Sequence, residues 1–368
     1  MTRGGQCPTC GLSLETCQYG GYHPRDVREI ATDQILDAVE ILGYEADAFL
    51  RWPWRVLDEL YGGIAPGTVH YVVAFSGMGK TTFIGSAILR WLELGMPIDV
   101  MPLENKPNIF RAYLACQTLG IDPGLMMSGD YLKREDAKDL RERVRAALVA
   151  QTKEEMGELL DVHEAPRVSA HILHDAARRA KARGAKVLIV DHIDHVNDVD
   201  GNVKRSLWEA SVAVNREAHR VAKETGLPLI LMSQANQEAL RNSRDKLAKY
   251  MPPQENHVLF GGQKRMVATG MLGLYRPLLP LPSGSDPEAF EEWKETIALA
   301  RQGTTTPQTA LEPFTMGVNL MKSRNYGGRE GNRVSLAWEA GRIVDRVLSL
   351  VRDDEARKHS IRTSRSVA

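Results

Sequence analysis

The sequence predicts an α/β fold with a central, mostly parallel sheet, and two observations support this prediction. Apolar runs short enough to be buried strands recur along the chain, at 98–103, 186–190 and 228–232. Between these runs lie longer segments, such as 81–94 and 206–225, in which apolar residues recur at helical spacing. This alternation is typical of βαβ units, in which helices cover both faces of a parallel sheet.

The expected elements follow from this alternation. Helices are expected at 26–42, 81–94, 107–119, 134–148, 169–183 and 206–225, the last one capped by Ser206. Strands are expected at 68–74, 98–103, 159–163, 186–190, 228–232, 266–275 and 315–322, with a final hairpin of 334–337 and 342–346. Residues 49–60 are expected to be a connecting segment, and 276–313 a surface insertion.

Composition excludes several classes of protein. The 368-residue chain has 47 Lys+Arg and 47 Asp+Glu, and its formal net charge of zero excludes a globally basic nucleic-acid binder but not a local basic path. No apolar run is long enough to span a membrane, and residues 1–7 lack the apolar core of a signal peptide. Three of the 4 cysteines lie within the first 17 residues, which is unlike a secreted disulfide framework. We therefore expect a cytoplasmic protein.

The loop after the first expected strand has the spacing of a P-loop. Residues 74–81 read Ala-Phe-Ser-Gly-Met-Gly-Lys-Thr, with alanine in the first glycine position. Such a loop turns backbone N–H groups inward as an anion cradle at a helix N-terminus. Lys80 would reach the β- and γ-phosphates of a nucleotide and the Thr81 hydroxyl would ligate Mg²⁺; the alternative is a chance match in a strand–turn–helix. The expected nucleotide contacts are Ser76, Gly77, Met78, Gly79, Lys80, Thr81 and Thr82.

Two further strands end in a carboxylate. Asp191 follows the run 186–190 and, with a P-loop upstream, would hold the hydration shell of Mg²⁺; the alternative is an ordinary turn residue. Glu104 follows the run 98–103 and could orient or deprotonate the attacking water; the alternative is a solvated strand end or a helix cap.

Polar side chains also end two later strands. Gln234 could sense the γ-phosphate and pass its loss to the next loop; the alternative is a satisfied buried amide. Lys322 and Arg324 share a strand face and could present two cations to one phosphate group; the alternative is a solvated strand end.

Taken together, these strand ends resemble the RecA-type motor domain of the replicative hexameric helicases, in the DnaB-like and the phage primase-helicase groups. The motifs that carry the resemblance are 74–83, 100–105, 186–195, 233–234 and 322–325. It implies a RecA-like P-loop NTPase core in which Glu104 is the catalytic glutamate and Gln234 the sensor, while Lys322 and Arg324 act on the neighbouring subunit's nucleotide. It also implies ATP or another NTP with Mg²⁺, a homo-oligomeric, hexameric ring, single-stranded DNA, and a primase or loader as partner.

In RecA-like rings, two loops near the central channel hold single-stranded DNA. The matching segments here are 194–207 and 236–259, which follow the strands ending at Asp191 and Gln234. Their cations could track a phosphate backbone, although acidic neighbours leave a solvated charged loop as the alternative. The expected DNA contacts are Lys204, Arg205, Arg241, Arg244, Lys246 and Lys249.

A cysteine cluster near the start of the chain has the spacing of a zinc knuckle. Cys7, Cys10, Cys17 and His23 read C-x₂-C-x₆-C-x₅-H, and Cys₃His is a standard ligand set for structural zinc. The alternative is free thiols on a disordered arm, and His23 is the less secure ligand. Cys116 lies in an apolar helix and is expected in the core.

The sequence therefore predicts an NTP-driven single-stranded DNA translocase, the motor of a replicative DNA helicase that works as a ring. One alternative is a RecA/RadA/KaiC-like DNA-dependent ATPase without processive unwinding, and another is a nucleotide-controlled DNA-binding scaffold. The expected domains are a zinc-binding segment at 1–25, a linker helix at 26–48, a RecA-like NTPase/helicase domain at 49–350 and a basic disordered tail at 351–368.

Overall fold

The computed structural model describes most of the chain between Phe49 and Val351. The described residues are 49–151, 154–197, 199–200, 203–204, 206–236, 252–254, 257–259, 261–276, 315–323, 330–339 and 342–351. The predicted zinc-binding segment, the linker helix, the insertion beyond Arg276 and the tail beyond Val351 lie outside these ranges. The domain bounds given above therefore stay predictions.

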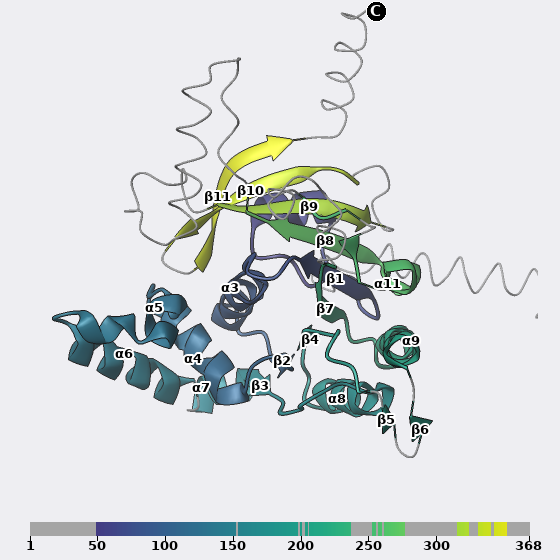
Figure 1. The fold of residues 1–368 in the computed structure, drawn as a ribbon, viewed down its shortest axis with the longest axis horizontal. Helices are drawn as coiled ribbons and strands as arrows, with labels where there is room; N and C mark the ends of the chain where they lie inside the picture. The colour runs from purple at the N-terminus through teal and green to yellow at the C-terminus, as the bar shows by residue number, and fades with distance from the viewer. Residues whose placement is uncertain are drawn as a thin grey trace, which may run out of the picture. The chain divides into compact units, whose positions relative to one another are not determined.

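One sheet of nine strands organises the described part of the chain (Figure 1). Its strands are β1 (Val69–Ala74), β2 (Ile98–Pro102), β3 (Leu160–Val162), β4 (Val187–Asp191), β7 (Leu229–Gln234), β8 (Gly270–Tyr275), β9 (Thr315–Ser323), β10 (Arg333–Glu339) and β11 (Arg342–Val351). Their order is β11-β10-β9-β8-β1-β7-β4-β2-β3. The strands from β8 to β3 are parallel to one another, and β9, β10 and β11 pair antiparallel. A separate antiparallel pair joins β5 (Val199–Asp200) to β6 (Val203–Lys204).

The central strands are mostly apolar because both faces of the sheet are covered. Every residue of β1, β2 and β4 is buried, including the polar His70, Asp99 and Asp191, so the strands do not alternate between apolar and polar residues. The helices are α2 (Arg55–Tyr61), α3 (Lys80–Glu93), α4 (Pro107–Thr118), α5 (Pro123–Ser128), α6 (Ala137–Ala150), α7 (Glu154–Leu159), α8 (Ala170–Ala182), α9 (Leu207–Thr225) and α11 (Gly261–Val267). Figure 1 shows α3 and α4 on one side of the parallel strands and α8 and α9 on the other. The α/β prediction is thus confirmed.

Local sequence explains where the long helix α9 begins. The Ser206 hydroxyl accepts a hydrogen bond from the Glu209 N–H at 3.2 Å, and the Glu209 carboxylate accepts one from the Ser206 N–H at 2.9 Å. This capping box satisfies two N–H groups that the helix itself leaves unpaired. The prediction that Ser206 caps this helix is confirmed.

Two predictions of local structure are wrong. The segment expected only to connect, 49–60, contains the start of α2, and its Trp54 stacks on Phe83 of α3 with ring centroids 4.6 Å apart. The strand expected at 266–275 begins only at Gly270, because the chain before it forms α11. In α11 Met266 is exposed and Lys264 is buried, and this inversion of the usual pattern hides the helix from a sequence-based prediction.

The glycine that begins β8 leaves room for the Tyr61 side chain of α2 beside His70 of β1. A Cβ atom on Gly270 would lie 2.0 Å from the Tyr61 hydroxyl oxygen and 3.1 Å from Nδ1 of His70. The predicted final hairpin is confirmed as β10 and β11, which pair from Arg333 with Val351 to Glu339 with Arg342. Among the described helices, none has the length and apolarity that a bilayer-crossing segment requires.

Candidate functional site

The predicted P-loop connects the end of β1 to the start of α3. Gly77 and Gly79 both adopt positive φ angles, 75° and 88°, which favour glycine over residues with a Cβ atom. Gly79 is the N-cap of α3, and no side chain caps the helix there. The first N–H groups of α3 are therefore open to an anion, as the sequence predicts for this loop.

Lys80 places a desolvated cation beside this loop. Its side chain is buried, and Nζ lies 3.5 Å from the Ala74 carbonyl oxygen. Burial lowers the pKa of the Lys80 ammonium, while the nearby carboxylates of Asp191, Glu104 and Asp194 oppose that change. A cation held this way is favourably placed for an anionic ligand.

Thr81 and Asp191 meet across the edge of the sheet. The Thr81 hydroxyl donates a hydrogen bond to Oδ2 of Asp191 at 3.0 Å. Burial raises the pKa of the Asp191 carboxyl, and the Lys80 charge and the Thr81 hydrogen bond act against it. Oδ1 of Asp191 is buried and has no hydrogen-bond partner among the described residues. A hydroxyl next to an unpaired carboxylate oxygen is an oxygen-ligand set that fits Mg²⁺ and its water.

Glu104 lies at the same edge, just beyond β2. The N–H groups of Leu103 and Glu104 lie 2.6 Å and 3.3 Å from the Asp191 carbonyl oxygen, so the backbones of β2 and β4 bring the two acids together. The Glu104 side chain is 54 % exposed, which leaves its carboxylate accessible to water. Its Oε2 atom lies 3.9 Å from Nε2 of His192.

Gln234 ends the strand next to the P-loop strand. It is level with Ala74 in the parallel register, and the following N–H, that of Ala235, donates to the Ala74 carbonyl at 2.8 Å. Its own N–H donates to Oδ2 of Asp194 at 2.7 Å. The strand ends therefore bring Lys80, Thr81, Glu104, Asp191 and Gln234 to one edge of the sheet.

A buried ion pair that the sequence does not predict lies behind this edge. Lys264 of α11 is fully buried and pairs with Asp194, which follows β4. Burial raises the pKa of the Asp194 carboxyl, but the Lys264 charge, the nearby His192 ring and the hydrogen bonds from Lys264 and the Gln234 N–H outweigh it and hold that pKa well below its usual range. From the sequence, Asp194 is expected only at the start of a DNA-binding loop. A lysine within Gly-Gly-Gln-Lys-Arg carries no signal of burial, so local pattern does not reveal the pair.

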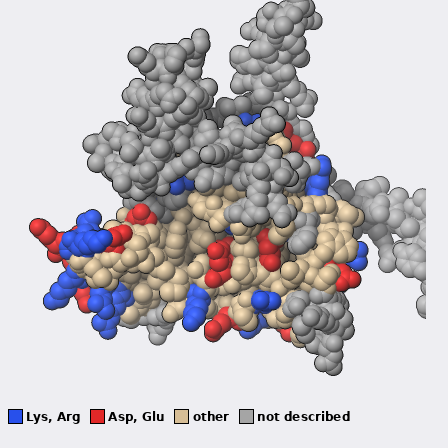
Figure 2. Space-filling model, viewed as in Figure 1, with Lys and Arg blue, Asp and Glu red and all other residues tan. Residues whose placement is uncertain are grey.

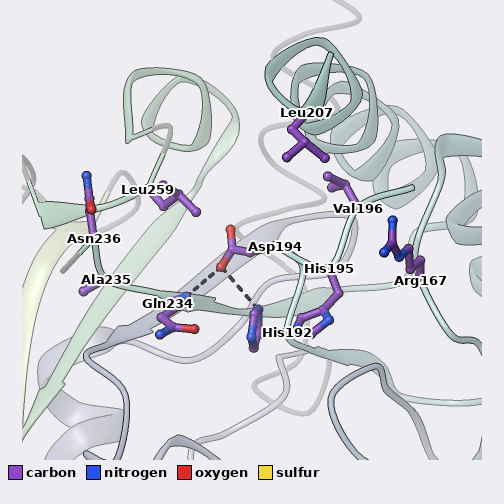
Figure 3. A pocket seen from close by; sticks show the side chains of 10 residues that line it. All are labelled: Arg167, His192, Asp194, His195, Val196, Leu207, Gln234, Ala235, Asn236 and Leu259. Atoms are coloured by element: carbon purple, nitrogen blue, oxygen red, sulfur yellow. Dashed lines mark hydrogen bonds and ion pairs between the residues drawn. The ribbon is translucent and has the colours of Figure 1, made fainter. Parts of the chain in front are cut away.

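A pocket of about 540 Å³ lies beside Gln234 (Figure 3). It is bounded by the segment after β4, the start of α9 and the segment after β7. The first predicted DNA-binding loop begins and ends at this pocket, with Asp194 and Leu207, and the second does so with Asn236 and Leu259. Figure 3 shows His192, Asp194 and Gln234 side by side at its base. The lining residues are Arg167, His192, Asp194, His195, Val196, Leu207, Gln234, Ala235, Asn236 and Leu259.

Lys322 lies away from its own P-loop. The register places it beside Met271, which pairs with Tyr71, three residues or about 10 Å before the end of β1. Its ammonium donates a hydrogen bond to the Arg265 carbonyl oxygen. Thr82, another predicted contact, is buried with its hydroxyl 2.8 Å from that of Tyr113. Neither side chain therefore faces the cradle of its own chain.

Several predicted residues lie outside the described part of the chain. They are Arg324, all four zinc ligands Cys7, Cys10, Cys17 and His23, and the predicted DNA contacts Arg205, Arg241, Arg244, Lys246 and Lys249. Lys204 belongs to β6. Cys116 is in the core as expected, and burial raises the pKa of its thiol to about 11.

The charged helix α6 does not present a surface of one sign. On the face shown in Figure 2, Lys and Arg side chains are interspersed with Asp and Glu at the end of the domain where α6 lies. Asp139 and Glu142 lie among the cations Lys138, Arg141, Arg143 and Arg145, and Arg143 lies 3.8 Å from Asp139. This helix is therefore a poor candidate for a path that tracks phosphates.

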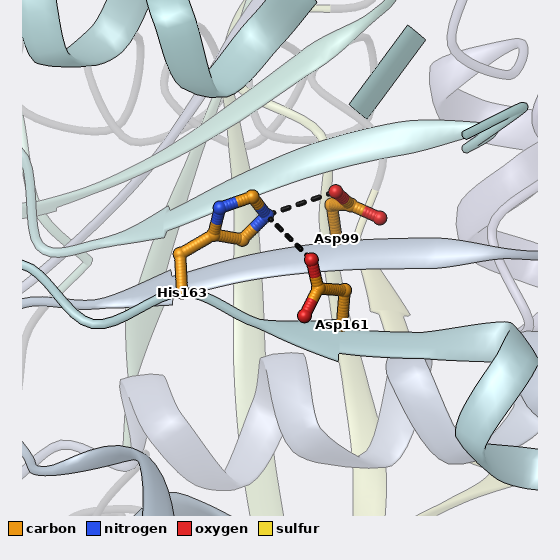
Figure 4. Close-up of side chains that lie close together, drawn as sticks. All are labelled: Asp99, Asp161 and His163. Atoms are coloured by element: carbon orange, nitrogen blue, oxygen red, sulfur yellow. Dashed lines mark hydrogen bonds and ion pairs between the residues drawn. The ribbon is translucent and has the colours of Figure 1, made fainter. Parts of the chain in front are cut away.

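Metal-ligating side chains also meet between β2 and the end of β3, where Asp99 lies three residues before the end of β2 (Figure 4). Nε2 of His163 lies 2.8 Å from Asp99 and 3.5 Å from Asp161. Nδ1 of His163 contacts the Arg179 guanidinium, and Arg183 donates to Asp99 at 2.8 Å and 3.1 Å. Both ring nitrogens and the buried carboxylate already have partners, so we assign this cluster to stability and not to metal binding.

Comparison with known proteins places the chain in a family. The model of the DnaB-like helicase C-terminal domain matches residues 51–249. No curated protein sequence matches the chain. A solved DnaB-like replicative helicase, described with its interactions with primase, is 16 % identical with a TM-score of 0.62, covering 88 % of this chain and 67 % of that one. A second solved structure, described as an ATPase domain, is also 16 % identical with a TM-score of 0.62, covering 88 % of this chain and 100 % of that one.

At 16 % identity, the two structures support a similarity of fold alone. That fold is a mostly parallel sheet, which is consistent with a RecA-like core. The family match covers more than half of the chain and includes the P-loop, Glu104, Asp191 and Gln234. The chain belongs to the DnaB-like helicase C-terminal domain family.

Proposed function

We propose that this protein hydrolyses an NTP, ATP in the first instance, to move along single-stranded DNA as the ring-shaped motor of a replicative helicase. The observation that carries the proposal is the edge where the P-loop, the buried Lys80 and the Thr81–Asp191 pair converge. Glu104 and Gln234 end neighbouring strands at the same edge. Because the chain belongs to the DnaB-like helicase C-terminal domain family, we propose that this NTPase site drives a helicase.

In this proposal each side chain has a distinct role. The N–H groups of the P-loop and the Lys80 ammonium bind the β- and γ-phosphates. Thr81 and Asp191 would hold Mg²⁺, which when bound neutralises charge on the phosphate oxygens. The exposed Glu104 carboxylate orients the attacking water or accepts its proton. Gln234 responds to the γ-phosphate.

The remaining groups come from neighbours and loops. Because Lys322 lies about 10 Å behind the end of β1, it and Arg324 are proposed to serve the nucleotide of an adjacent subunit. Single-stranded DNA would follow the loops 194–207 and 236–259. The solved relative described with primase suggests a primase as a partner to test here, in the cytoplasm where replication motors act.

Turnover by a P-loop variant tests the central proposal. In Lys80→Ala, DNA-stimulated NTP hydrolysis should be lost while the melting temperature stays near that of the wild type, because the side chain faces the anion cradle. Lys186→Ala is the matched control, since Lys186 is exposed just before β4. Wild-type turnover in folded Lys80→Ala would refute the NTPase site. Strand displacement on a forked duplex then separates a helicase from an ATPase that does not unwind.

We also propose that Cys7, Cys10, Cys17 and His23 bind one structural zinc ion. Metal analysis of the purified protein should find zinc, and Cys10→Ser should lower its content. Cys116→Ser is the control, because Cys116 is buried in the domain core. Equal zinc content in both variants would contradict the proposed ligand set.

A further inference from the structure

The side chain of Asp194 takes the place of a missing strand partner beside Gln234. Where β7 faces β4, the Met232 carbonyl accepts a hydrogen bond from the Ile193 N–H at 2.9 Å. The next N–H group on that side of β7 belongs to Gln234, but β4 has already ended at Asp191. Oδ2 of Asp194 accepts this N–H at 2.7 Å. A side chain thus continues the hydrogen bonding of the sheet at the residue that is proposed to sense the nucleotide.

Lys264 fixes the Asp194 carboxylate from the buried side. Its ammonium donates to Oδ1 of Asp194 and, at 2.7 Å, to the Ser233 hydroxyl. The Ser233 hydroxyl in turn donates to Oδ2 of Asp194 at 3.1 Å. The side chains of Lys264 and Asp194 are 0 % and 5 % exposed, and a buried pair with this many hydrogen bonds is held in one geometry.

The network also joins both segments that leave this edge of the sheet. Asp194 begins the segment between β4 and α9, and Gln234 precedes the segment between β7 and α11. Lys264 belongs to α11, where that second segment ends. His192 adds a contact toward the catalytic side, since its Nδ1 lies 3.5 Å from Oδ2 of Asp194 and its Nε2 lies 3.9 Å from Glu104.

We infer that Asp194, fixed by Lys264, is the positioning residue that sets Gln234 against the nucleotide and couples it to both loops. The inference rests on the proposed function, because it explains how the sensor of that site is held. A displacement of the Gln234 backbone at the end of β7 moves the Asp194 carboxylate. Asp194 itself lies in the segment after β4, and its carboxylate is also bonded to Lys264 of α11. Replacing it should therefore change turnover without changing nucleotide affinity, since Lys80, Thr81 and Asp191 are untouched.

Two double variants separate the effect of the oxygen that accepts the Gln234 N–H from the effect of the Asp194–Lys264 charge pair. Asp194→Ala/Lys264→Met removes both charges and the acceptor. Asp194→Asn/Lys264→Met removes both charges but keeps a carbonyl oxygen at the same position. Because neither variant leaves a buried charge unpaired, both avoid the largest cost of breaking such a pair. Melting temperature, affinity for a fluorescent nucleotide analogue and kcat with and without single-stranded DNA are measured for each.

The alanine variant should lose on the order of tenfold or more in kcat, because a displaced catalytic side chain costs rate and not binding. The asparagine variant should recover most of that loss at equal nucleotide affinity. In a Gln234→Ala background the two variants should have equal kcat, since Asp194 acts through Gln234. Equal kcat of the two variants with Gln234 present, or a loss that persists in the Gln234→Ala background, would overturn the inference.

The same measurements distinguish this inference from the proposed function. If the wild-type protein hydrolyses NTP but Gln234→Ala has wild-type kcat, the positioning role of Asp194 is refuted and the proposed NTPase site is still supported. If the wild-type protein does not hydrolyse NTP, with or without single-stranded DNA, both the inference and the proposed function are refuted.

Discussion

His70 shows how a single buried residue can make the stability of this protein depend on pH. It lies on β1, four residues before the P-loop, with Nδ1 2.5 Å from the Tyr61 hydroxyl and Nε2 2.6 Å from the Thr68 hydroxyl. Burial lowers the pKa of His70 from 6.5 to about 3. Between these values the unfolded chain binds a proton that the folded chain does not, so stability falls as the pH falls.

We therefore expect the free energy of unfolding to lose about 1.4 kcal/mol per pH unit from this residue below pH 6.5. Urea unfolding at pH 6.5, 5.5 and 4.5 measures it, with His70→Gln as the variant that keeps polar atoms but has no titrating ring. The difference between wild type and variant should shrink as the pH falls. A difference that does not change with pH would show that His70 binds a proton equally well in the folded and unfolded states, so that burial does not lower its pKa.

Residues of the site differ in how well the sequence predicts them. Lys80 and Thr81 are predicted by the spacing of the P-loop, and Glu104, Asp191 and Gln234 stand at the polar ends of predicted strands, which a parallel sheet brings together. Asp194 and Lys264 could not be paired in this way, because they are 70 residues apart and no periodicity links them. The pair depends on how the segment after β4 and helix α11 pack together, which local pattern does not contain.

At the scale of elements, the loops after β4 and β7 are where we expect DNA. Replacing Arg241, Arg244 and Lys246 together by alanine should weaken single-stranded DNA binding and flatten its salt dependence. Each lost phosphate contact should reduce the log–log slope by roughly 0.7. Binding isotherms at several salt concentrations give this slope.

The matched control is Lys138, Arg141 and Arg145 on α6, all exposed and of the same composition. Replacing these three should leave the slope unchanged, because acidic neighbours share that helix. If the loop variant keeps the wild-type slope, the DNA path lies elsewhere on the protein.

The sequence predicts helices best where the helical spacing of apolar residues extends over many residues. Helices α3 and α9 have 14 and 19 residues, and their expected bounds agree with the structure to within one residue at either end. Helices α2, α5 and α7 have 7, 6 and 6 residues, too few for helical periodicity to emerge. For α2 the packing is visible at its N-cap residue Trp54, which stacks on Phe83 of α3.

At the scale of the whole molecule, the position of Lys322 predicts that one chain alone hydrolyses NTP poorly. If Arg324 serves its neighbour's γ-phosphate, Arg324→Ala should reduce turnover by roughly 10³–10⁵. Nucleotide binding should survive better, because the cradle belongs to the other subunit. Mixing Arg324→Ala with Lys80→Ala chains should restore part of the activity, since some interfaces then join an intact P-loop to an intact Arg324.

Subunit exchange in the mixed sample is verified first, for example by fluorescence transfer between labelled chains. Unmixed variants at the same total concentration provide the baseline. Full activity of Arg324→Ala alone rules out a role for Arg324 at the nucleotide of the neighbouring subunit. No recovery in rings that do exchange subunits contradicts the simple assignment between subunits, unless turnover requires every site in sequence.

The place of β1 in the sheet also governs how the chain must fold as it is made. Val69 pairs with Leu229 and His70 with Gly270, partners that leave the ribosome 160 and 200 residues later. At ordinary rates of synthesis both edges of this wholly buried strand wait roughly 10 to 40 s for their neighbours. Unpaired strand edges recruit other chains, so we expect the nascent protein to be open to aggregation during that interval. A fragment cut at residue 249, where the family match ends, retains β7 but never receives β8, and its open edge predisposes it to aggregate.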